Sequence, residues 1–254
     1  IDNNSTFNFL FKILKQKKKL ELDDLGYLIA PILNSAGRLD NANQIVELFT
    51  TSSNKRKIQI IKKIYNLNLK RKLLEKKCLN DLNFIDLYKI KGVLFIYKTN
   101  IPEGIIGIIA ARIKDYFNKP CIVFTNSKNI IKGSARSTLD FNIGEYIQNA
   151  FNKKILLGGG GHNLAAGVSL LESNMLTFQK FLDFHYLKKK NFSKNFYVSR
   201  ILLNTINKKF FNDIKILGPF GNKNSNPLFL IEQVNIIKPK IIKDKFISCF
   251  LQKN

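Results

Sequence analysis

The sequence is poor in the residues that build metal centres and disulfide frameworks. It has only two histidines in 254 residues, and no Asp and His side chains cluster into a metal-binding motif. Its three cysteines are far apart and odd in number, which excludes a zinc-ligand spacing and a disulfide framework. Isolated, reduced thiols are typical of a cytoplasmic protein. Phosphodiester hydrolysis commonly uses two metal ions held by several Asp and His side chains, so this chain alone is not expected to form a metal centre.

Long apolar runs and acidic residues are also scarce. No run reaches the ~18 apolar residues that a membrane span needs, and the N-terminus lacks the pattern of a signal peptide. The 18 Asp and Glu stand against 42 Lys and Arg, which gives a formal net charge of +24. This balance favours a polyanionic partner, above all nucleic acid. An AT-rich genome, which favours Lys, Asn and Ile codons, is an alternative origin for part of the charge.

The first third of the chain predicts a loop, a short helix and a long helix. Residues 28–40 contain many small residues and predict a loop that leads into a helix over 42–49. From 55 to 82 apolar residues recur at helical spacing, and between Lys55 and Lys77 ten Lys and Arg stand against one acid, Glu75. The predicted apolar face consists of Ile58, Ile61, Tyr65, Leu69 and Leu73. This basic helix is a solvated connection between domains, a positive wall beside a nucleic-acid path, or both.

The rest of the chain predicts an α/β domain and a smaller β-rich domain. Strands over 92–97, 120–124 and 130–137 alternate with helices over 105–117, 141–151 and 176–187, as in an α/β domain. After residue 195, short β-like segments, a helix ending at Leu217 and turn signals indicate a small β-barrel that stops before it closes.

The most distinctive segment is a run of four glycines closed by a histidine, at residues 158–162. Glycine has no side chain, so another molecule can approach the backbone, and successive N–H groups can converge on an anion. The small residues over 163–167 suit a tight helix start, where phosphate groups commonly bind. The alternative is a flexible glycine loop. The second histidine, His185, lies on an apolar helix and is expected to be structural.

Two further motifs place one arginine among small residues, NSAGR at 34–38 and GSARS at 133–137. The planar guanidinium matches phosphate oxygens bidentately, and serine hydroxyl and glycine N–H groups can fill the remaining positions. The alternative for each motif is an arginine that satisfies nearby carbonyl groups in a turn. Three clusters of this kind in one chain favour phosphate binding.

With these motifs in this order, the sequence resembles the RecJ family of single-stranded-DNA-specific exonucleases, within the DHH phosphoesterase superfamily. The matching segments are PILNSAGRLDNA (31–42), EGIIGIIAARI (103–113), KGSARS (132–137), GGGGHNLAAG (158–167) and LGPFGNKNSNPLF (217–229). The glycine-histidine motif alone indicates only a DHH-associated domain, which alanyl-tRNA synthetases and nucleases of short RNAs share. The NSAGR and GPFG segments are what point to RecJ.

The resemblance implies a domain order. The family has a catalytic DHH domain that holds Mn²⁺ or Mg²⁺ through Asp and His, a long connecting helix, a DHH-associated domain and an OB-fold. In this chain that predicts the tail of a DHH domain over 1–50, the basic connecting helix over 51–83, a DHH-associated α/β domain over 84–190 and a partial OB-like domain over 191–254. The DHH signature and an initiator Met are missing, so the resemblance implies part of a longer protein, inactive by itself.

The resemblance also assigns roles to residues. Arg38 would hold the terminal 5′ phosphate or the adjacent backbone, and the associated domain would do the same through its GSARS motif. The glycine-histidine motif would line the DNA near the scissile phosphate, with His162 as the catalytic residue. The residues expected to bind phosphate or substrate are Asn34, Arg38, Ser134, Arg136, Gly160, Gly161 and His162. Pro102 departs from the family, which often has a histidine there.

The implied function is a 5′→3′ exonuclease that hydrolyses phosphodiester bonds of single-stranded DNA in repair and recombination, with this chain supplying nucleic-acid binding. Aromatic side chains of the OB-like part, Phe220 and Phe229, are either core residues or platforms for unpaired bases. Two alternatives stay open. One is a stand-alone, non-catalytic module for single-stranded nucleic acid, and the other is a DHH-family phosphatase or oligonucleotide phosphodiesterase, which leaves the barrel-like tail unexplained.

Overall fold

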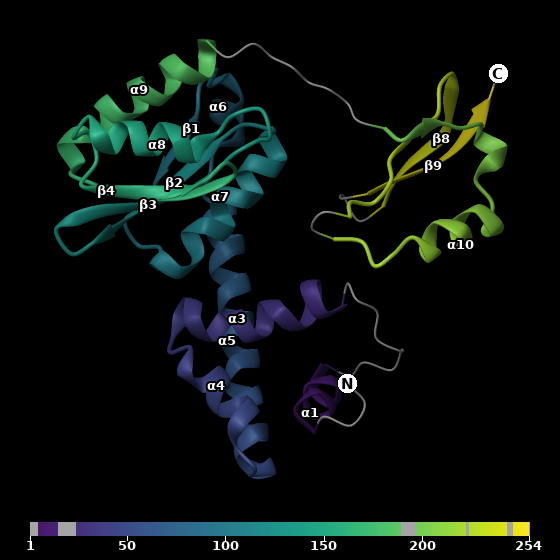
Figure 1. Cartoon of the computed structure of the whole chain (residues 1–254), viewed down its shortest axis with the longest axis horizontal. Coiled ribbons are helices and arrows are strands. Elements are labelled where there is room, and N and C mark those ends of the chain that lie inside the picture. Colours follow the sequence, from purple (N-terminus) through teal and green to yellow (C-terminus); the bar gives the residue numbers. More distant parts are fainter. Residues whose placement is uncertain (1–4, 15–23, 189–196, 222–223, 243–245, 254) are drawn as a thin grey trace. The chain divides into compact units, whose positions relative to one another are not determined.

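The structure is a computed structural model, and it describes residues 5–14, 24–188, 197–221, 224–242 and 246–253. The chain divides into two compact units, one within residues 1–192 and one within 193–254. The predicted α/β class is confirmed, with a basic helix before a mixed sheet and a β-rich unit after it (Figure 1). Residues 1–4, Phe196 and residues 222–223, which the sequence analysis used, lie outside the described residues.

The first unit begins with a helical layer built around one long helix. Its elements are α1 (Ser5–Leu14), the π-helical turn η1 (Leu25–Ile29), α3 (Ala30–Leu39), α4 (Asn43–Thr50) and α5 (Asn54–Asn80). The loop predicted over 28–40 is wrong, because this segment is the helix α3. Its small residues let it pack closely on α5: the buried Ser35 hydroxyl donates hydrogen bonds to the carbonyls of Ile32, at 2.6 Å, and Ile64, at 2.9 Å.

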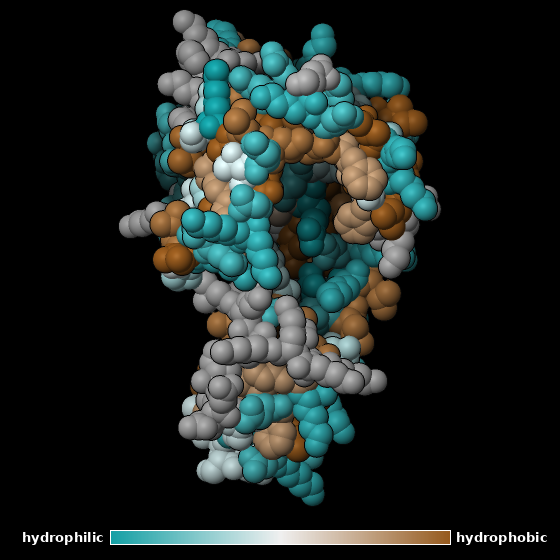
Figure 2. Space-filling view, turned by 90° about the vertical axis from the view of Figure 1, so that its right-hand side faces the viewer, coloured by the Kyte–Doolittle hydropathy of each residue, from teal (hydrophilic) through white to brown (hydrophobic). Residues whose placement is uncertain are grey.

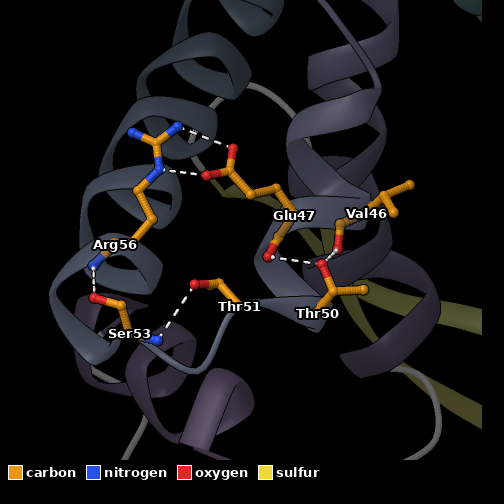
Figure 3. A network of polar contacts seen from close by, with 6 residues as sticks. All are labelled: Val46, Glu47, Thr50, Thr51, Ser53 and Arg56. Atoms are coloured by element: carbon orange, nitrogen blue, oxygen red, sulfur yellow. Dashed lines mark hydrogen bonds and ion pairs between the residues drawn. The ribbon is translucent and has the colours of Figure 1, made fainter.

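A polar network fixes the corner between α4 and α5 (Figure 3). The Ser53 hydroxyl caps α5 by accepting a hydrogen bond from the backbone N–H of Arg56, at 3.3 Å. The Arg56 guanidinium then reaches back and donates two hydrogen bonds to the carboxylate of Glu47 on α4. The Thr51 hydroxyl accepts from the backbone of Ser53 at 3.3 Å. These contacts set the direction in which α5 leaves the corner.

The helical period predicted for α5 is confirmed, but the predicted buried face is wrong in its second half. Leu69 and Leu73 are 42% and 68% exposed. The buried positions are Ile60, Ile61, Ile64, Asn68, Arg71, Glu75 and Cys78. Beyond Ile64 the helix therefore turns a polar stripe inward. The apolar pattern alone missed this stripe because charged side chains were assumed to face solvent.

A mixed five-stranded sheet forms the rest of the first unit. The elements are α6 (Phe84–Lys89), β1 (Leu94–Tyr97), α7 (Glu103–Phe117), β2 (Cys121–Ser127), β3 (Ile130–Arg136), α8 (Ile143–Asn152), β4 (Gly158–His162), β5 (Ala165–Leu170), η2 (Glu172–Asn174) and α9 (Met175–Lys188). The strand order is β1-β2-β3-β5-β4, with β1 and β2 parallel and the other neighbours antiparallel. The three predicted strands and three predicted helices of this region are confirmed.

The two faces of the sheet are covered differently. On one face α8 and α9 bury a core that includes Phe124, Ala135, Val168 and Phe178. On the other face α7 packs on β2 and β3. Ile105, Ile109, Cys121 and Val123 belong to the core that it buries there. On this second face the glycines of β5 and β4 stay exposed in the described part of the chain. The sheet thus keeps an open strip beside α7.

The second unit contains short strands and one helix. Its elements are β6 (Ser199–Arg200), η3 (Leu203–Thr205), α10 (Lys208–Ile216), β7 (Phe229–Leu230), β8 (Val234–Ile242) and β9 (Phe246–Lys253). The described strands pair as β6 with β7 and as the hairpin β8–β9. Phe229 packs edge-on against Phe210, which favours its core interpretation.

The surface of the second unit carries apolar side chains between its charged ones. On the hairpin β8–β9 the exposed apolar residues include Ile236, Ile241, Phe246, Ile247 and Phe250. Figure 2 shows such apolar surface, in brown, among hydrophilic residues in teal. None of the helices in the described residues combines the length and apolar character that a bilayer crossing requires.

The first turn of α7 lies so close to the end of α3 that a side chain does not fit between them. A Cβ atom added to Gly104 would lie 2.1 Å from the carbonyl oxygen of Arg38. We expect Gly104→Ala to lower the free energy of unfolding by about 1–3 kcal/mol, because backbone must shift to relieve the clash. Urea denaturation measures the change. The control is Gly167→Ala, whose Cβ meets nothing within 4 Å. Equal stabilities for the two variants would contradict this packing.

Candidate phosphate-binding site

Two of the predicted arginines come together at the start of α7. Arg38 ends α3, while Ser134 and Arg136 lie at the end of β3. Segments almost one hundred residues apart therefore meet around the first turn of α7, where Gly104 and Gly107 leave room for them. The sequence motifs predicted this pair as phosphate-binding residues, and the structure places both on one side of the sheet.

Arg38 is fixed by the backbone of α7. Its guanidinium donates a hydrogen bond to the carbonyl of Gly104 at 2.8 Å. A guanidinium has five N–H donors in a fixed fork, so this bond orients the group while other donors remain for a ligand. Arg38 thus satisfies a nearby carbonyl group, as the alternative interpretation predicted. This contact is compatible with phosphate binding, which stays a prediction.

Arg136 is fixed by its own strand. It donates to the Ser134 hydroxyl at 3.2 Å and to the carbonyl of Ala135 at 2.8 Å. A Cβ on Gly107 would lie 2.9 Å from both the Arg136 guanidinium and the Ser134 hydroxyl oxygen. Glycine at this position of α7 therefore allows both side chains to reach the helix.

The two guanidinium groups are partly desolvated and repel each other. Partial burial lowers the pKa of Arg38, and the positive charge of Arg71 lowers it further. Burial also lowers the pKa of Arg136, and the charge of Arg38 adds to that effect. Among the described residues, neither guanidinium has a carboxylate within ion-pair distance. An anion between them would offset both the desolvation and the repulsion.

The glycine run is a strand, and the small residues over 163–167, which were expected to start a helix, form a turn and the first part of β5. Residues 158–162 form β4, which pairs antiparallel with β5 over 165–170. No glycine in the described residues has a positive φ, so the run does not form the alternating backbone geometry of an anion nest. The expectation that its N–H groups converge on an anion is therefore wrong for the described residues. The run instead forms a bare edge strand on the open part of the sheet.

Strand register decides which glycines share a face with the arginine pair. Ser134 is paired with Gly167, which is paired with Gly160, and Arg136 is related to His162 in the same way through β5. Directly paired residues point to the same side of a sheet, so Gly160 and His162 share the face of Arg136. They lie two strands away, roughly 10 Å.

Gly161 lies at the alternate register, on the face that α8 covers. A Cβ on it would come within 2.4 Å of the backbone of Ala165 and Ala166. Close packing therefore requires glycine at this position, and its predicted contact with phosphate stays a prediction. By contrast, a Cβ on Gly160 or Gly167 meets nothing within 4 Å. Those two positions are open to another molecule.

A shallow groove of about 440 Å³ follows this open strip. Its lining includes Ser134, Lys132, Glu103 and three glycines of β4 and β5, namely Gly158, Gly159 and Gly167. Lys132 and Glu103 form an ion pair across it, 3.0 Å between Nζ and Oε2. A hydrogen bond from Ser127, followed by the contact with Lys132, lowers the pKa of Glu103. One wall of the groove is therefore polar and the floor is bare backbone.

The remaining predicted residues lie apart from the pair. Asn34 is exposed on α3, one turn before Arg38, and both line a larger cavity. His162 is exposed at the end of β4. His185 stacks on Tyr146, 4.8 Å between ring centroids, and also contacts Phe181, as a structural histidine does.

Three charged residues of this region escaped the sequence analysis. Arg71, Glu75 and Arg112 join α5 to α7 through ion pairs. The signal was present as a polar stripe spaced at three and four residues along α5, but it was hidden by the many lysines around it. No group of three or more His, Cys, Asp or Glu side chains gathers in the described residues. These residues do not fit a divalent metal, and we derive no step through one.

Comparisons with known proteins identify both units. The family model of the DHHA1 domain matches residues 90–184, and that of the RecJ OB domain matches residues 199–254. The chain is 33% identical over 168 residues to the single-stranded-DNA-specific exonuclease RecJ of Haemophilus influenzae, covering 61% of this chain and 29% of that protein. It is 27% identical over 220 residues to RecJ of Bacillus subtilis, covering 83% of this chain and 28% of the relative.

Solved structures agree with this assignment at the level of the fold. The crystal structure of RecJ from Thermus thermophilus in complex with Mn²⁺ matches with a TM-score of 0.80 and 20% identity, over 97% of this chain and 37% of that one. The Mg²⁺ complex from the same organism gives a TM-score of 0.79. The chain therefore spans less than a third of the length of the curated relatives. The predicted resemblance to RecJ is confirmed.

An anion between Arg38 and Arg136 should stabilise the folded chain. We expect inorganic phosphate to raise the free energy of unfolding over chloride at equal ionic strength, by about 1.4 kcal/mol at tenfold its dissociation constant. Thermal unfolding measures this. In Arg136→Gln only the general stabilisation by a kosmotropic salt should remain. If the wild-type chain and the variant respond equally to phosphate, the pair is not an anion site.

Proposed function

We propose that this RecJ-like chain binds the 5′-terminal phosphate of single-stranded DNA and holds the strand for 5′→3′ exonucleolytic hydrolysis. The observation that carries the proposal is the pair of half-buried guanidinium groups of Arg38 and Arg136. Their positive charges repel each other, and no carboxylate of the described residues forms an ion pair with either one. The relatives' printed names specify single-stranded DNA and exonuclease activity, and these properties are part of the proposal for this chain.

Each group in the site has a distinct role in this proposal. The two guanidinium groups present planar forks to the phosphate oxygens, and the Ser134 hydroxyl, already in contact with Arg136, fills a further position. A terminal phosphate carries more negative charge than a diester, so a site with two cations prefers it. A chain end held in this way fixes the direction from which the strand is degraded.

The open strip of the sheet supports the strand beyond its end. Gly167 lines the groove and Gly160 is paired with it on the edge strand. A Cβ on either meets nothing within 4 Å, so a sugar-phosphate chain can lie against this backbone without meeting side chains. His162, on the same face and exposed, is placed to contact the scissile phosphate as the catalytic residue of this chain. The contact with bases is minimal, which suits hydrolysis of any sequence.

Mn²⁺ or Mg²⁺ would be held by side chains other than those that the structure describes. The solved RecJ structures are complexes with these ions, which supports a divalent metal for the reaction. A bound metal ion would provide an activated water and charge stabilisation. The match of the RecJ OB domain to residues 199–254 favours this function over a DHH-family phosphatase, which needs no such domain.

The preference for a 5′ phosphate tests the role of the arginine pair. We expect the chain to bind 5′-phosphorylated oligothymidylate roughly 10- to 100-fold more tightly than the 5′-hydroxyl form, because hydrogen bonds to charged groups are the strong ones. Arg136→Gln should remove this difference. Fluorescence anisotropy measures both affinities. In Lys70→Gln, which removes an exposed charge of α5, the preference should persist. Equal binding of both ends by the unmodified chain would refute the proposal.

A nuclease assay separates the binding role from catalysis. With Mn²⁺ added, this chain alone should release no nucleotide from single-stranded DNA, since its described residues gather no metal ligands. Gel analysis of end-labelled DNA detects cleavage. If the chain released mononucleotides with Mn²⁺ and stopped when Mn²⁺ was removed, it would hold the metal itself. The proposal that it supplies only strand binding would then be wrong.

A further inference from the structure

A second basic cavity lies in the first unit, apart from the groove over the sheet. It has a volume of about 640 Å³ and is lined by residues of α3, α5 and α7, a size typical of ligand pockets, about 300–1,000 Å³. Four of its lining residues are cations, namely Arg38, Arg71, Lys72 and Arg112. No Asp or Glu is among its lining residues in the described part of the chain.

One buried carboxylate organises two of these cations. Glu75 accepts a hydrogen bond from Arg71 at 2.8 Å on one oxygen and from Arg112 at 3.0 Å on the other. Arg71 also donates to the Asn68 side chain at 3.1 Å. Glu75 is only 9% exposed, whereas the side chain of Arg112 is 64% exposed. The carboxylate therefore fixes Arg112 at one N–H and leaves the rest of its fork accessible.

The cavity keeps an excess of positive charge after this pairing. Glu75 offsets one of four cations, so about three positive charges surround the cavity. Arg38 also belongs to the phosphate site described above, and the charge of Arg71 lowers its pKa. An anion in the cavity would reduce this repulsion, as in other clusters of like charge.

Two aromatic rings line the same cavity. Tyr27 is 85% exposed, and Tyr65 of α5 also lines the cavity. Proteins that bind single-stranded nucleic acid combine cations, which contact the sugar-phosphate backbone, with aromatic rings, on which the bases stack. A free inorganic anion would need only the cations.

We propose that this cavity is a second binding site for the single strand, which takes an internal backbone phosphate with Lys72 and Arg112 and its base on Tyr27. This inference rests on the proposed function and adds a site to it. Arg38 belongs to both sites, so the strand would pass from the phosphate site at Arg38 and Arg136 along α3 to α5. Glu75 acts as a positioning residue for Arg71 and Arg112.

The test compares two lysines of one helix. Lys72 lines the cavity and Lys70 does not, although both are exposed on α5. With a long 5′-hydroxyl oligothymidylate, Lys72→Gln and Arg112→Gln should each bind roughly tenfold more weakly than the wild-type chain. Each should lower the slope of log affinity against log salt by about 0.7, the value for one lost contact with a single strand. Lys70→Gln should change neither quantity beyond a small general charge effect.

Probe length and a free nucleotide separate the outcomes. A 5′-phosphorylated dinucleotide should bind all three variants like the wild-type chain, while Arg136→Gln weakens it, because only the first site contacts it. If Lys72→Gln and Lys70→Gln behave alike on the long strand, the second site is wrong and the first can still stand. If thymidine monophosphate competes for the Lys72-dependent binding at the concentration at which it blocks the first site, the cavity binds free nucleotides and not the strand. If the wild-type chain binds no oligonucleotide, the proposed function itself fails.

Discussion

The seating of α7 on the end of α3 is the contact on which the site depends. Gly104 allows the two backbones to touch, and the Arg38 guanidinium closes the contact through the Gly104 carbonyl. The hydrogen bond and the glycine act together, since a side chain at this position would push α3 away and take Arg38 with it. The same helix accommodates Arg136 and Ser134 at Gly107. One helix therefore positions ligand groups that come from both the helical layer and the sheet.

Much of the fold was predictable from the sequence, because two local patterns can be recognised there. Strands are rich in β-branched and aromatic residues, and helices have apolar residues at a regular period. The sheet from β1 to β3 and the helices α7 to α9 followed from that signal. The segment over 28–40 did not, since its small residues suit a loop as well as a tightly packed helix. Only the contact of Ser35 with the carbonyl of Ile64 decides for the helix. Local sequence carries no information about such a distant partner.

The closeness of Arg38 and Arg136 agrees with their small-residue motifs, and their role as phosphate ligands stays a prediction. Each guanidinium also satisfies a carbonyl group, as the alternative interpretation of the motifs expected. The glycine run was predicted to bind an anion in front of a helix start at 163–167, whereas strand pairing between 158–162 and β5 makes the run an edge strand. Pairing is a long-range property, and glycine has no propensity that opposes it strongly. Glu75 was counted as one acid among many bases, yet its two oxygens hold Arg71 of its own helix and Arg112 of α7, and so join α5 to α7.

The bare floor formed by Gly160 and Gly167 bears on motion as well as on fit. A polymer that advances over side chains must displace each of them, and every displacement adds a barrier that depends on which base is passing. Over exposed main chain the interaction repeats almost unchanged at each nucleotide. The energy profile along the track is then shallow, so under the proposed function a strand would step forward after each release without a large activation cost.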